Sequence, residues 1–248
     1  MEIITSVNNA LVKDTLKYQQ KKYRDSDGKF LLEGKKCITE AVQNGIEIDY
    51  IFVRTEKTNE YYFFKGRIIQ TNDVVLKKIS TTDSAPEAVG VANRKMYSKN
   101  DFKNLDKVIL LENIQDLGNL GTIIRTAAAL NVKGIVLYGK CADVYNPKCV
   151  RSTVGNLWKI PIINLHSVNE INELFKDYQK VATLPLSKNY LKDFKPKNKA
   201  LIMFGSEADG LSNELINIST EDLKIEMNEE VESLNLAISC AIVMYKIM

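Results

Sequence analysis

The chain has 248 residues, of which 45% are hydrophobic and 26% charged, so it can form one large or two modest globular domains. It has no run of about 18 apolar residues, and its start lacks the pattern of a signal peptide, so we expect no membrane span and a cytoplasmic location. Four cysteines without C-x-x-C spacing and a single histidine predict free, mostly buried thiols and no metal site.

The net charge of +3 is too small to identify a partner, but its distribution is uneven. Residues 1–100 carry 17 Lys/Arg and 13 Asp/Glu, whereas residues 101–248 carry 17 and 18. A basic front half is compatible with nucleic-acid binding, although this signal is weak when taken alone.

The first predicted element is a basic helix over residues 3–23. It starts with the capping-like sequence S-V-N-N-A and continues with apolar residues at helical spacing, interleaved with lysines. A solvated helix face would carry the same residues. The alternative is that the helix contacts RNA phosphates through Lys13, Lys17 and Lys21.

Strands and helices then alternate up to about residue 95, which predicts a small α/β domain over residues 1–95. The expected strands are residues 30–32, 49–54 and 67–70, with a further short run at 88–92. The expected helices are residues 35–44, 60–64 and 73–79. A polar stretch at residues 95–104 is the predicted linker.

A second α/β domain, with a mainly parallel sheet, is predicted over residues 105–248. The expected strands are residues 107–111, 132–138, 158–164, 180–184 and 200–204, with a short apolar stretch at 223–227. The expected helices are residues 119–131, 144–155 and 169–177, and a last one from residue 233. No internal repeat is present.

Three polar or glycine-bearing loops follow strand-like segments, at residues 112–118, 205–210 and 228–233. Because the carboxyl ends of parallel strands lie at one edge of a sheet, the three loops are expected to form one ligand crevice. A nicotinamide-dependent oxidoreductase is disfavoured, since the domain offers D-L-G-N-L-G in place of G-x-G-x-x-G. Neither a P-loop lysine nor a G-x-S-x-G elbow occurs.

The same loops carry a resemblance to a known family. N-I-Q-D-L-G-N-L-G-T-I-I-R-T-A-A-A-L-N-V (113–132), F-G-S-E-A-D-G-L-S (204–212) and I-E-M-N-E-E-V-E-S-L-N-L-A-I-S-C-A-I (225–242) resemble, in order, the three motifs of the SpoU/TrmH family of RNA ribose methyltransferases. Y-N-P-K-C-V-R-S-T-V-G (145–155) resembles the segment between its first two motifs. Residues 1–95 more loosely resemble the ribosomal-protein-like RNA-binding domain that often precedes it.

The resemblance implies methyl transfer from S-adenosylmethionine to a ribose 2′-hydroxyl of RNA. It also implies a knotted (trefoil) α/β fold, in which the last helix threads a loop, and a homodimer with each site at the subunit interface. Ribosomal RNA is preferred to tRNA as the substrate because the additional domain suits a large folded target. A non-catalytic RNA-binding or ribosome-assembly factor on the same fold is the alternative.

The catalytic residues that the resemblance implies are Asn119, Arg125, Glu207 and Asn235. By residue type alone, Asn119 is equally explained as a helix cap, Arg125 as a surface ion-pair residue and Glu207 as a turn carboxylate. A guanidinium stays charged and is a poor proton acceptor, so we expect Arg125 to act electrostatically on a phosphate or on the developing 2′-oxyanion.

The resemblance also implies a set of cofactor-binding residues, namely Leu184, Phe204, Gly205, Gly210, Ile225, Met227, Ser233 and Leu234. Turn glycines, core residues and an N-cap serine are the simpler explanations for several of them. Arg151 and Ser152 are further RNA-site candidates. The chain departs from the family at Leu117 and Glu226, where proline is usual.

Overall fold

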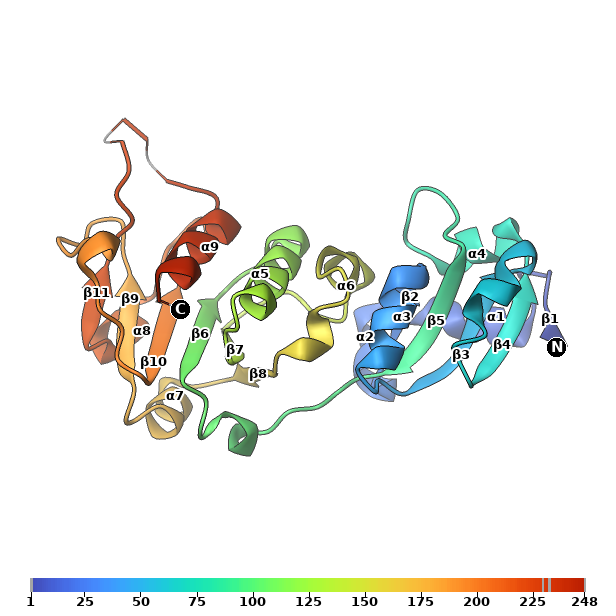
Figure 1. Cartoon of the computed structure of the whole chain (residues 1–248), viewed down its shortest axis with the longest axis horizontal. Helices are drawn as coiled ribbons and strands as arrows, with labels where there is room; N and C mark the ends of the chain where they lie inside the picture. The colour runs from blue at the N-terminus through green and yellow to red at the C-terminus, as the bar shows by residue number, and fades with distance from the viewer. Residues whose placement is uncertain (1, 229, 232, 248) are drawn as a thin grey trace. The chain divides into compact units, whose positions relative to one another are not determined.

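The structure is a computed structural model that describes residues 2–228, 230–231 and 233–247 (Figure 1). The chain forms two compact units. The first comprises Met1–Met96 together with Asp143–Trp158, and the second comprises Tyr97–Ala142 together with Lys159–Met248.

The first unit is built on a mixed five-stranded sheet. Its strand order is β1 (Glu2–Ile3), β4 (Arg67–Thr71), β3 (Ile48–Arg54), β5 (Ala88–Asn93) and β2 (Lys29–Glu33), with β5 antiparallel to both neighbours. The helices are α1 (Ala10–Lys17), α2 (Lys21–Asp27), α3 (Lys35–Gln43) and α4 (Asp73–Ile79), with a 3-10 helix, η1, at Thr55–Tyr61. Strands and helices thus occur close to where the sequence predicts them. The exceptions are the helices predicted over residues 3–23 and 60–64.

The single basic helix predicted over residues 3–23 is wrong. Residues 2–3 form an edge strand, and two short helices follow in place of one, α1 from residue 10 and α2 from residue 21. The reason is the buried side chain of Arg24, whose guanidinium donates to the carbonyl oxygens of Tyr18 and Gln19 at 2.9 and 2.8 Å. It thereby satisfies carbonyls at the end of α1, where the chain turns. The helix predicted at residues 60–64 is also displaced, because the structure has η1 there instead.

The segment Asp143–Trp158 is part of the first unit, although the sequence analysis assigns it to the second domain. It contains α6 (Pro147–Ser152), which packs against β2. The ring of Phe30 in β2 lies 4.8 Å from that of Tyr145 and 6.1 Å from that of Trp158, between centroids. Packing of Tyr145 and Trp158 against the buried ring of Phe30, which periodicity in sequence does not reveal, is the physical reason for the difference.

The second unit contains a six-stranded sheet in which every pair is parallel. Its order is β11 (Glu221–Leu223), β9 (Gln179–Thr183), β10 (Ala200–Phe204), β6 (Lys107–Glu112), β7 (Gly134–Tyr138) and β8 (Ile162–Leu165). The helices are α5 (Leu117–Ala129), α7 (Val168–Leu174), α8 (Asn213–Ile218) and α9 (Leu236–Ile247), and the 3-10 helices are η2 (Lys99–Phe102) and η4 (Leu191–Asp193). A further 3-10 helix, η3 (Leu157–Lys159), begins in the first unit and ends with the first residue after it.

The prediction of a mainly parallel α/β sheet is confirmed. The central strands are buried, β10 throughout and β6 from Val108 to Glu112, as near-continuous Val, Ile, Leu and Met runs require. The strand order reverses between β6 and β10, and such a reversal leaves a crevice at the carboxyl ends of the strands. The threading of the last helix through a loop stays a prediction.

Two boundaries in this unit differ from prediction. The strand expected at residues 158–164 is replaced by η3 and by β8, which begins after Pro161 because proline cannot donate to a sheet ladder. The last helix begins at Leu236 rather than at residue 233. Three cysteines are buried and Cys141 is partly buried, all with free thiols. No helix in the described ranges is long and apolar enough to cross a membrane.

We expect the buried ion pair between Arg24 and Asp143 to stabilise the first unit. The two groups lie 2.8 Å apart, with side chains 2% and 10% exposed. The Asp143→Ala substitution leaves a buried guanidinium unpaired and is expected to lower the free energy of unfolding by about 3–5 kcal/mol. Urea titration followed by the fluorescence of Trp158, the single tryptophan, measures this.

A matched control removes an exposed ion pair from the same unit. Asp14 and Lys17 are about half exposed, and exposed pairs contribute below about 1 kcal/mol. Asp14→Ala is therefore expected to shift the transition little. A loss in Asp143→Ala no larger than in Asp14→Ala would contradict the structural role of the buried pair.

Candidate active site

The side chain of Asn119 joins two loops of the second unit. Asp116 is the N-cap of α5, since its Oδ1 accepts from the backbone N–H of Asn119 at 2.7 Å. The Asn119 side chain is therefore not the cap, and it donates from Nδ2 to Oε1 of Glu207 at 2.5 Å. Its Oδ1 accepts from Nδ2 of Asn235 at 3.1 Å. Three of the four predicted catalytic residues thus lie in contact.

Asn235 connects this network to the last helix. Its Oδ1 accepts from the backbone N–H groups of Ala237 and Ile238 at 2.9 and 3.3 Å, so Asn235, rather than Ser233, has the position of an N-cap. These contacts orient the Asn235 amide with its NH₂ group toward Asn119. Each hydrogen bond between the start of α9 and Glu207 then has a defined donor: the helix N–H groups donate to Asn235, Asn235 donates to Asn119, and Asn119 donates to Glu207. We call Asn235, Asn119 and Glu207 the amide relay.

Arg125 lies outside the amide relay. It is exposed on α5, six residues after Asn119, which places it about 120° around the helix from that residue. It forms no hydrogen bond or ion pair with any residue that the structure describes. The alternative that Arg125 forms a surface ion pair is therefore not supported among the described residues. The electrostatic role of Arg125 stays a prediction.

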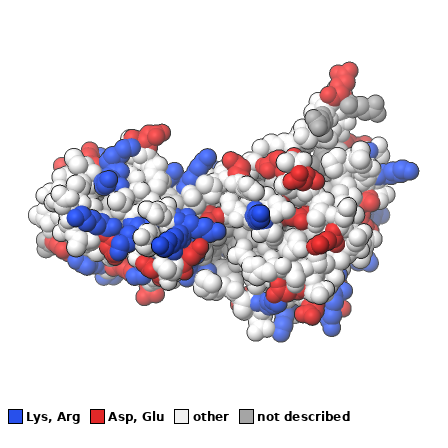
Figure 2. Space-filling view, turned by 180° about the vertical axis from the view of Figure 1, so that it is seen from behind, with Lys and Arg blue, Asp and Glu red and all other residues white. Residues whose placement is uncertain are grey.

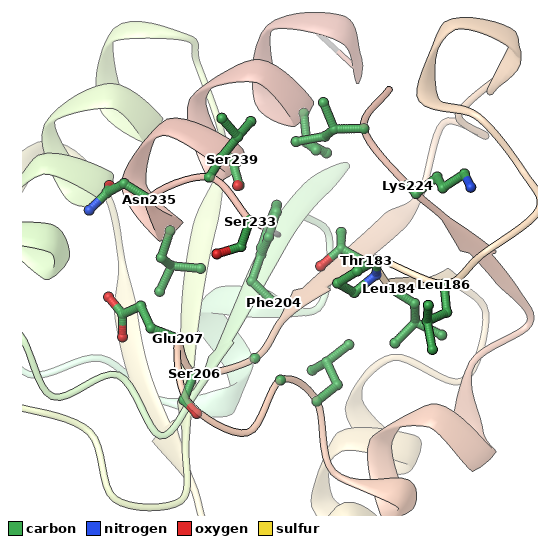
Figure 3. Close-up of a pocket in the computed structure, with 18 of the residues that line it drawn as sticks. Thr183, Leu184, Leu186, Phe204, Ser206, Glu207, Lys224, Ser233, Asn235 and Ser239 are labelled. Carbon is green, nitrogen blue, oxygen red and sulfur yellow. The ribbon is translucent and has the colours of Figure 1, made fainter. Parts of the chain in front are cut away.

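A cavity of about 680 Å³ lies against the amide relay, at the carboxyl ends of β9, β10 and β11. Figure 3 shows Glu207, Ser206 and Asn235 on one side of this cavity, with Leu184, Leu186 and Lys224 on the other. All eight predicted cofactor-binding residues line it, namely Leu184, Phe204, Gly205, Gly210, Ile225, Met227, Ser233 and Leu234. Their contacts with a bound cofactor stay predictions.

Sequence reasoning missed several lining residues. Thr183, Ser206, Asp209, Lys224 and Ser239 also face the cavity. Ser239 follows Asn235 by four residues and so lies on the same face of α9, a helical signal that was available in the sequence. Lys224 directly follows β11 and precedes Ile225. The position of that strand in the sheet, which the sequence does not reveal, places Lys224 at the cavity.

The glycine loop after β10 is closed on itself. Ser206 and Gly210 exchange both backbone hydrogen bonds, at 3.2 and 3.1 Å. A Cβ on Gly205 would lie 1.9 Å from the carbonyl carbon of Gly210, so only glycine fits at Gly205. Gly210 has φ +67° but open space around its Cα. The buried carboxylate of Glu112 accepts from the backbone N–H of Ser212 at 2.7 Å and holds the end of the loop.

The cavity lining combines apolar side chains with polar and charged ones on both of its sides. Its charged lining residues in the described part of the chain are Glu207, Asp209 and Lys224. Beneath it, burial raises the pKa of Cys240, and the negative charge of Glu207 raises it further. The thiol therefore stays protonated at neutral pH and is no nucleophile.

The predicted RNA-binding residues lie in the first unit. Lys13 and Lys21 are exposed, and Lys17 pairs with Asp14 at 2.6 Å. Arg151 donates to the buried carboxylate of Glu33, and Ser152 bonds within its own helix to Lys148. The guanidinium of Arg151 is therefore engaged inside the first unit, and an RNA contact by these residues stays a prediction.

A parallel α/β unit with a cavity at the carboxyl ends of its strands is the arrangement typical of enzymes that bind a small ligand or cofactor there. The chain belongs to the SpoU rRNA Methylase family, whose model matches residues 106–245. Residues 9–90 match the MRM3-like substrate binding domain. The family interpretation made from the three motifs is thereby confirmed.

Relatives extend over the whole chain. It is 30% identical to an uncharacterised tRNA/rRNA methyltransferase of Synechocystis, covering 98% of this chain and 92% of the relative. It is 28% identical to the 23S rRNA (guanosine(2553)-2′-O)-methyltransferase RlmP of Bacillus subtilis, over 99% and 98%. The AdoMet-bound rRNA methyltransferase of Sinorhizobium meliloti is similar in structure, with a TM-score of 0.89, 27% identity and coverage of 99% and 96%.

The two loop glycines give contrasting predictions. Gly205→Ala forces its Cβ into the backbone of Gly210, so the cavity wall shifts and binding of S-adenosylmethionine is expected to be lost. Gly210→Ala meets no atom and costs only the strain of a left-handed backbone, about 1 kcal/mol of stability, with binding close to wild type. Equilibrium dialysis with labelled S-adenosylmethionine distinguishes the two. Equal binding by both variants would contradict this account of the loop.

Proposed function

We propose that this protein transfers a methyl group from S-adenosylmethionine to a ribose 2′-hydroxyl of ribosomal RNA. The observation that carries the proposal is the amide relay, which joins the three motifs and fixes the Glu207 carboxylate at the rim of a cavity lined by the second and third of them and by residues 183–186. The 2′-O-methyltransferase activity in the name of the Bacillus relative supports the reaction type.

The cavity suits this cofactor in size and in lining. Its volume is within the range of ligand pockets, about 300–1,000 Å³. Apolar side chains such as Leu184, Ile225 and Met227 suit an adenine ring, while the carboxylates of Glu207 and Asp209 suit the positive charges of the sulfonium and ammonium groups. When bound, S-adenosylmethionine supplies a methyl group activated for displacement.

The residues of the relay have distinct parts in this proposal. Oε1 of Glu207 is held by Asn119, while Oε2 has no hydrogen bond with any described residue and is available to a ribose hydroxyl. Accepting that hydrogen bond would orient the 2′-oxygen for in-line attack. Arg125 contributes positive charge for a phosphate or for the developing oxyanion. Asn119 and Asn235 keep the carboxylate in place.

The proposed partner is ribosomal RNA, and the first unit is the part of the chain that we propose to bind it. Figure 2 shows Lys and Arg side chains forming a band across one face of that unit, whereas both signs are interspersed on the second. The match to a substrate-binding domain model supports the same assignment. A cytoplasmic location follows from such a substrate. A tRNA substrate and a non-catalytic assembly factor are the alternatives that experiment must separate.

We infer a homodimer from an apolar stripe on α9. Ile238, Ile242 and Tyr245 are 50%, 38% and 78% exposed, and their spacing of four and three residues puts them on one helical face. The opposite side of α9 is buried and packs against α5. An exposed apolar stripe beside the start of α9 supports a subunit interface near the amide relay.

Nucleoside analysis tests the proposed reaction. The protein is incubated with labelled S-adenosylmethionine and unmodified 23S rRNA or tRNA transcripts, and the RNA is digested to nucleosides. We expect label in a 2′-O-methylnucleoside from 23S rRNA only. Label in tRNA alone would favour the tRNA alternative. Cofactor binding without transfer to either RNA would favour the assembly factor.

Asn119→Ala is expected to lower kcat about 100-fold, since it releases the Glu207 carboxylate that positions the ribose. The affinity for S-adenosylmethionine should change little, because Asn119 does not line the cavity. Single-turnover methyl transfer and dialysis measure the two quantities. An unchanged kcat would contradict the role given to the relay.

Ile238→Asp places a charge in the apolar stripe and is expected to give a monomer. Val74→Asp is the matched control, because Val74 is 65% exposed on α4 in the first unit. Light scattering after gel filtration gives the mass of each variant. A dimeric Ile238→Asp protein, or a monomeric wild type, would contradict the proposed interface.

A further inference from the structure

The connector between β9 and β10, residues 184–199, concentrates positive charge. It contains five lysines and one aspartate, whereas the second unit as a whole carries 16 Lys/Arg and 17 Asp/Glu. The lysines are Lys188, Lys192, Lys195, Lys197 and Lys199. A cluster of this kind on an otherwise slightly acidic unit points to an anionic partner.

The connector begins at the cavity. Leu184 and Leu186 line it, and Leu186 is also 95% exposed (Figure 3). The ring of Tyr190 is partly exposed, with the Nζ atoms of Lys192 and Lys224 at 5.2 and 4.8 Å from its centroid. An accessible ring flanked by ammonium groups combines the two features that bind single-stranded nucleic acid, namely stacking surface and charge.

This part of the connector is held in one conformation. Ser187 and Asn189 donate to the Oδ1 atom of Asp222, at 2.5 and 2.9 Å. Two backbone bonds of 2.8 Å, from Lys224 to Asn189 and from Leu191 to Lys224, attach the same loop to the end of β11. The exposure of Leu186 and Tyr190 is therefore imposed by hydrogen bonds and presents them to solvent in a fixed arrangement.

Part of the positive charge is available to a ligand. Lys192 is paired with Glu226 at 2.5 Å, but both side chains are about half exposed, so the pair is weak. Lys188 and Lys195 are exposed and form no ion pair with any described residue. Binding of phosphates by these two lysines would break no ion pair with the part of the chain that the structure describes.

We propose that Leu186, Lys188, Tyr190, Lys195 and Lys224 form a second RNA-binding surface, located on the catalytic unit. We call it the connector surface. It binds nucleotides that flank the methylated one: the lysines contact phosphates, and Tyr190 with Leu186 receives an unstacked base. This inference rests on the proposed function, because it assumes that the ribose is presented at the cavity.

The test compares two double variants with equal loss of charge. Lys188→Gln/Lys195→Gln alters the connector surface. Lys103→Gln/Lys176→Gln is the matched control, since these exposed lysines lie just before β6 and β9, at the amino ends of the strands, opposite the cavity. Binding of the full chain to unmodified 23S rRNA transcript is measured by filter retention over a range of KCl concentrations.

We expect the connector variant to bind RNA more weakly and to reduce the slope of log K against log salt by about 1.5, corresponding to two lost phosphate contacts. The control should keep the wild-type slope, and both should bind S-adenosylmethionine as wild type does. Tyr190→Ala should lower RNA affinity about tenfold, with Tyr190→Phe close to wild type because the ring remains.

Equal slopes for both double variants, with full affinity in Tyr190→Ala, would overturn the proposal. A loss confined to ribosomal particles, with naked RNA bound normally, would also overturn it and assign the connector surface to a protein partner. Failure of the proposed function has a different signature. In that case no transcript is methylated by the wild type, whatever the salt slopes show.

Discussion

The contact between the Asn119 amide and the Glu207 carboxylate is the interaction on which the site depends. It joins the start of α5 to the glycine loop after β10, and Asn235 extends it to α9. Each amide has its oxygen and nitrogen fixed by a different partner, so the carboxylate is held without a counter-charge. A carboxylate held by neutral donors keeps its negative charge available for a substrate hydroxyl.

The parallel sheet makes this contact possible. Residues 119, 207 and 235 are far apart in the chain, but the strands preceding the first two are adjacent, since β6 pairs with β10. Their carboxyl ends therefore open at the same edge. The close approach of Gly205 to Gly210 then shapes the loop that carries Glu207. The chemistry of the site thus follows from strand order, glycine placement, two amide side chains and one carboxylate.

Much of this was accessible from sequence because the motifs are local. The buried runs of β6 and β10 and many of the residues around the cavity could be named from short segments, although Thr183 and Lys224 could not. What sequence did not reveal depends on tertiary contacts. Arg24 divides the first helix because it is buried and binds carbonyls, and nothing in a K-K-Y-R-D stretch indicates burial. Likewise, Asp116 rather than Asn119 caps α5, a choice that residue preferences leave open.

Isothermal titration with S-adenosylmethionine tests most directly whether the cavity beside the amide relay is the cofactor site. We expect saturable binding to the wild type and loss of affinity in Asn235→Ala, because Asn235, unlike Asn119, lines the cavity and caps α9. Absence of binding by the wild type, both alone and with 23S rRNA present, would contradict the central claim.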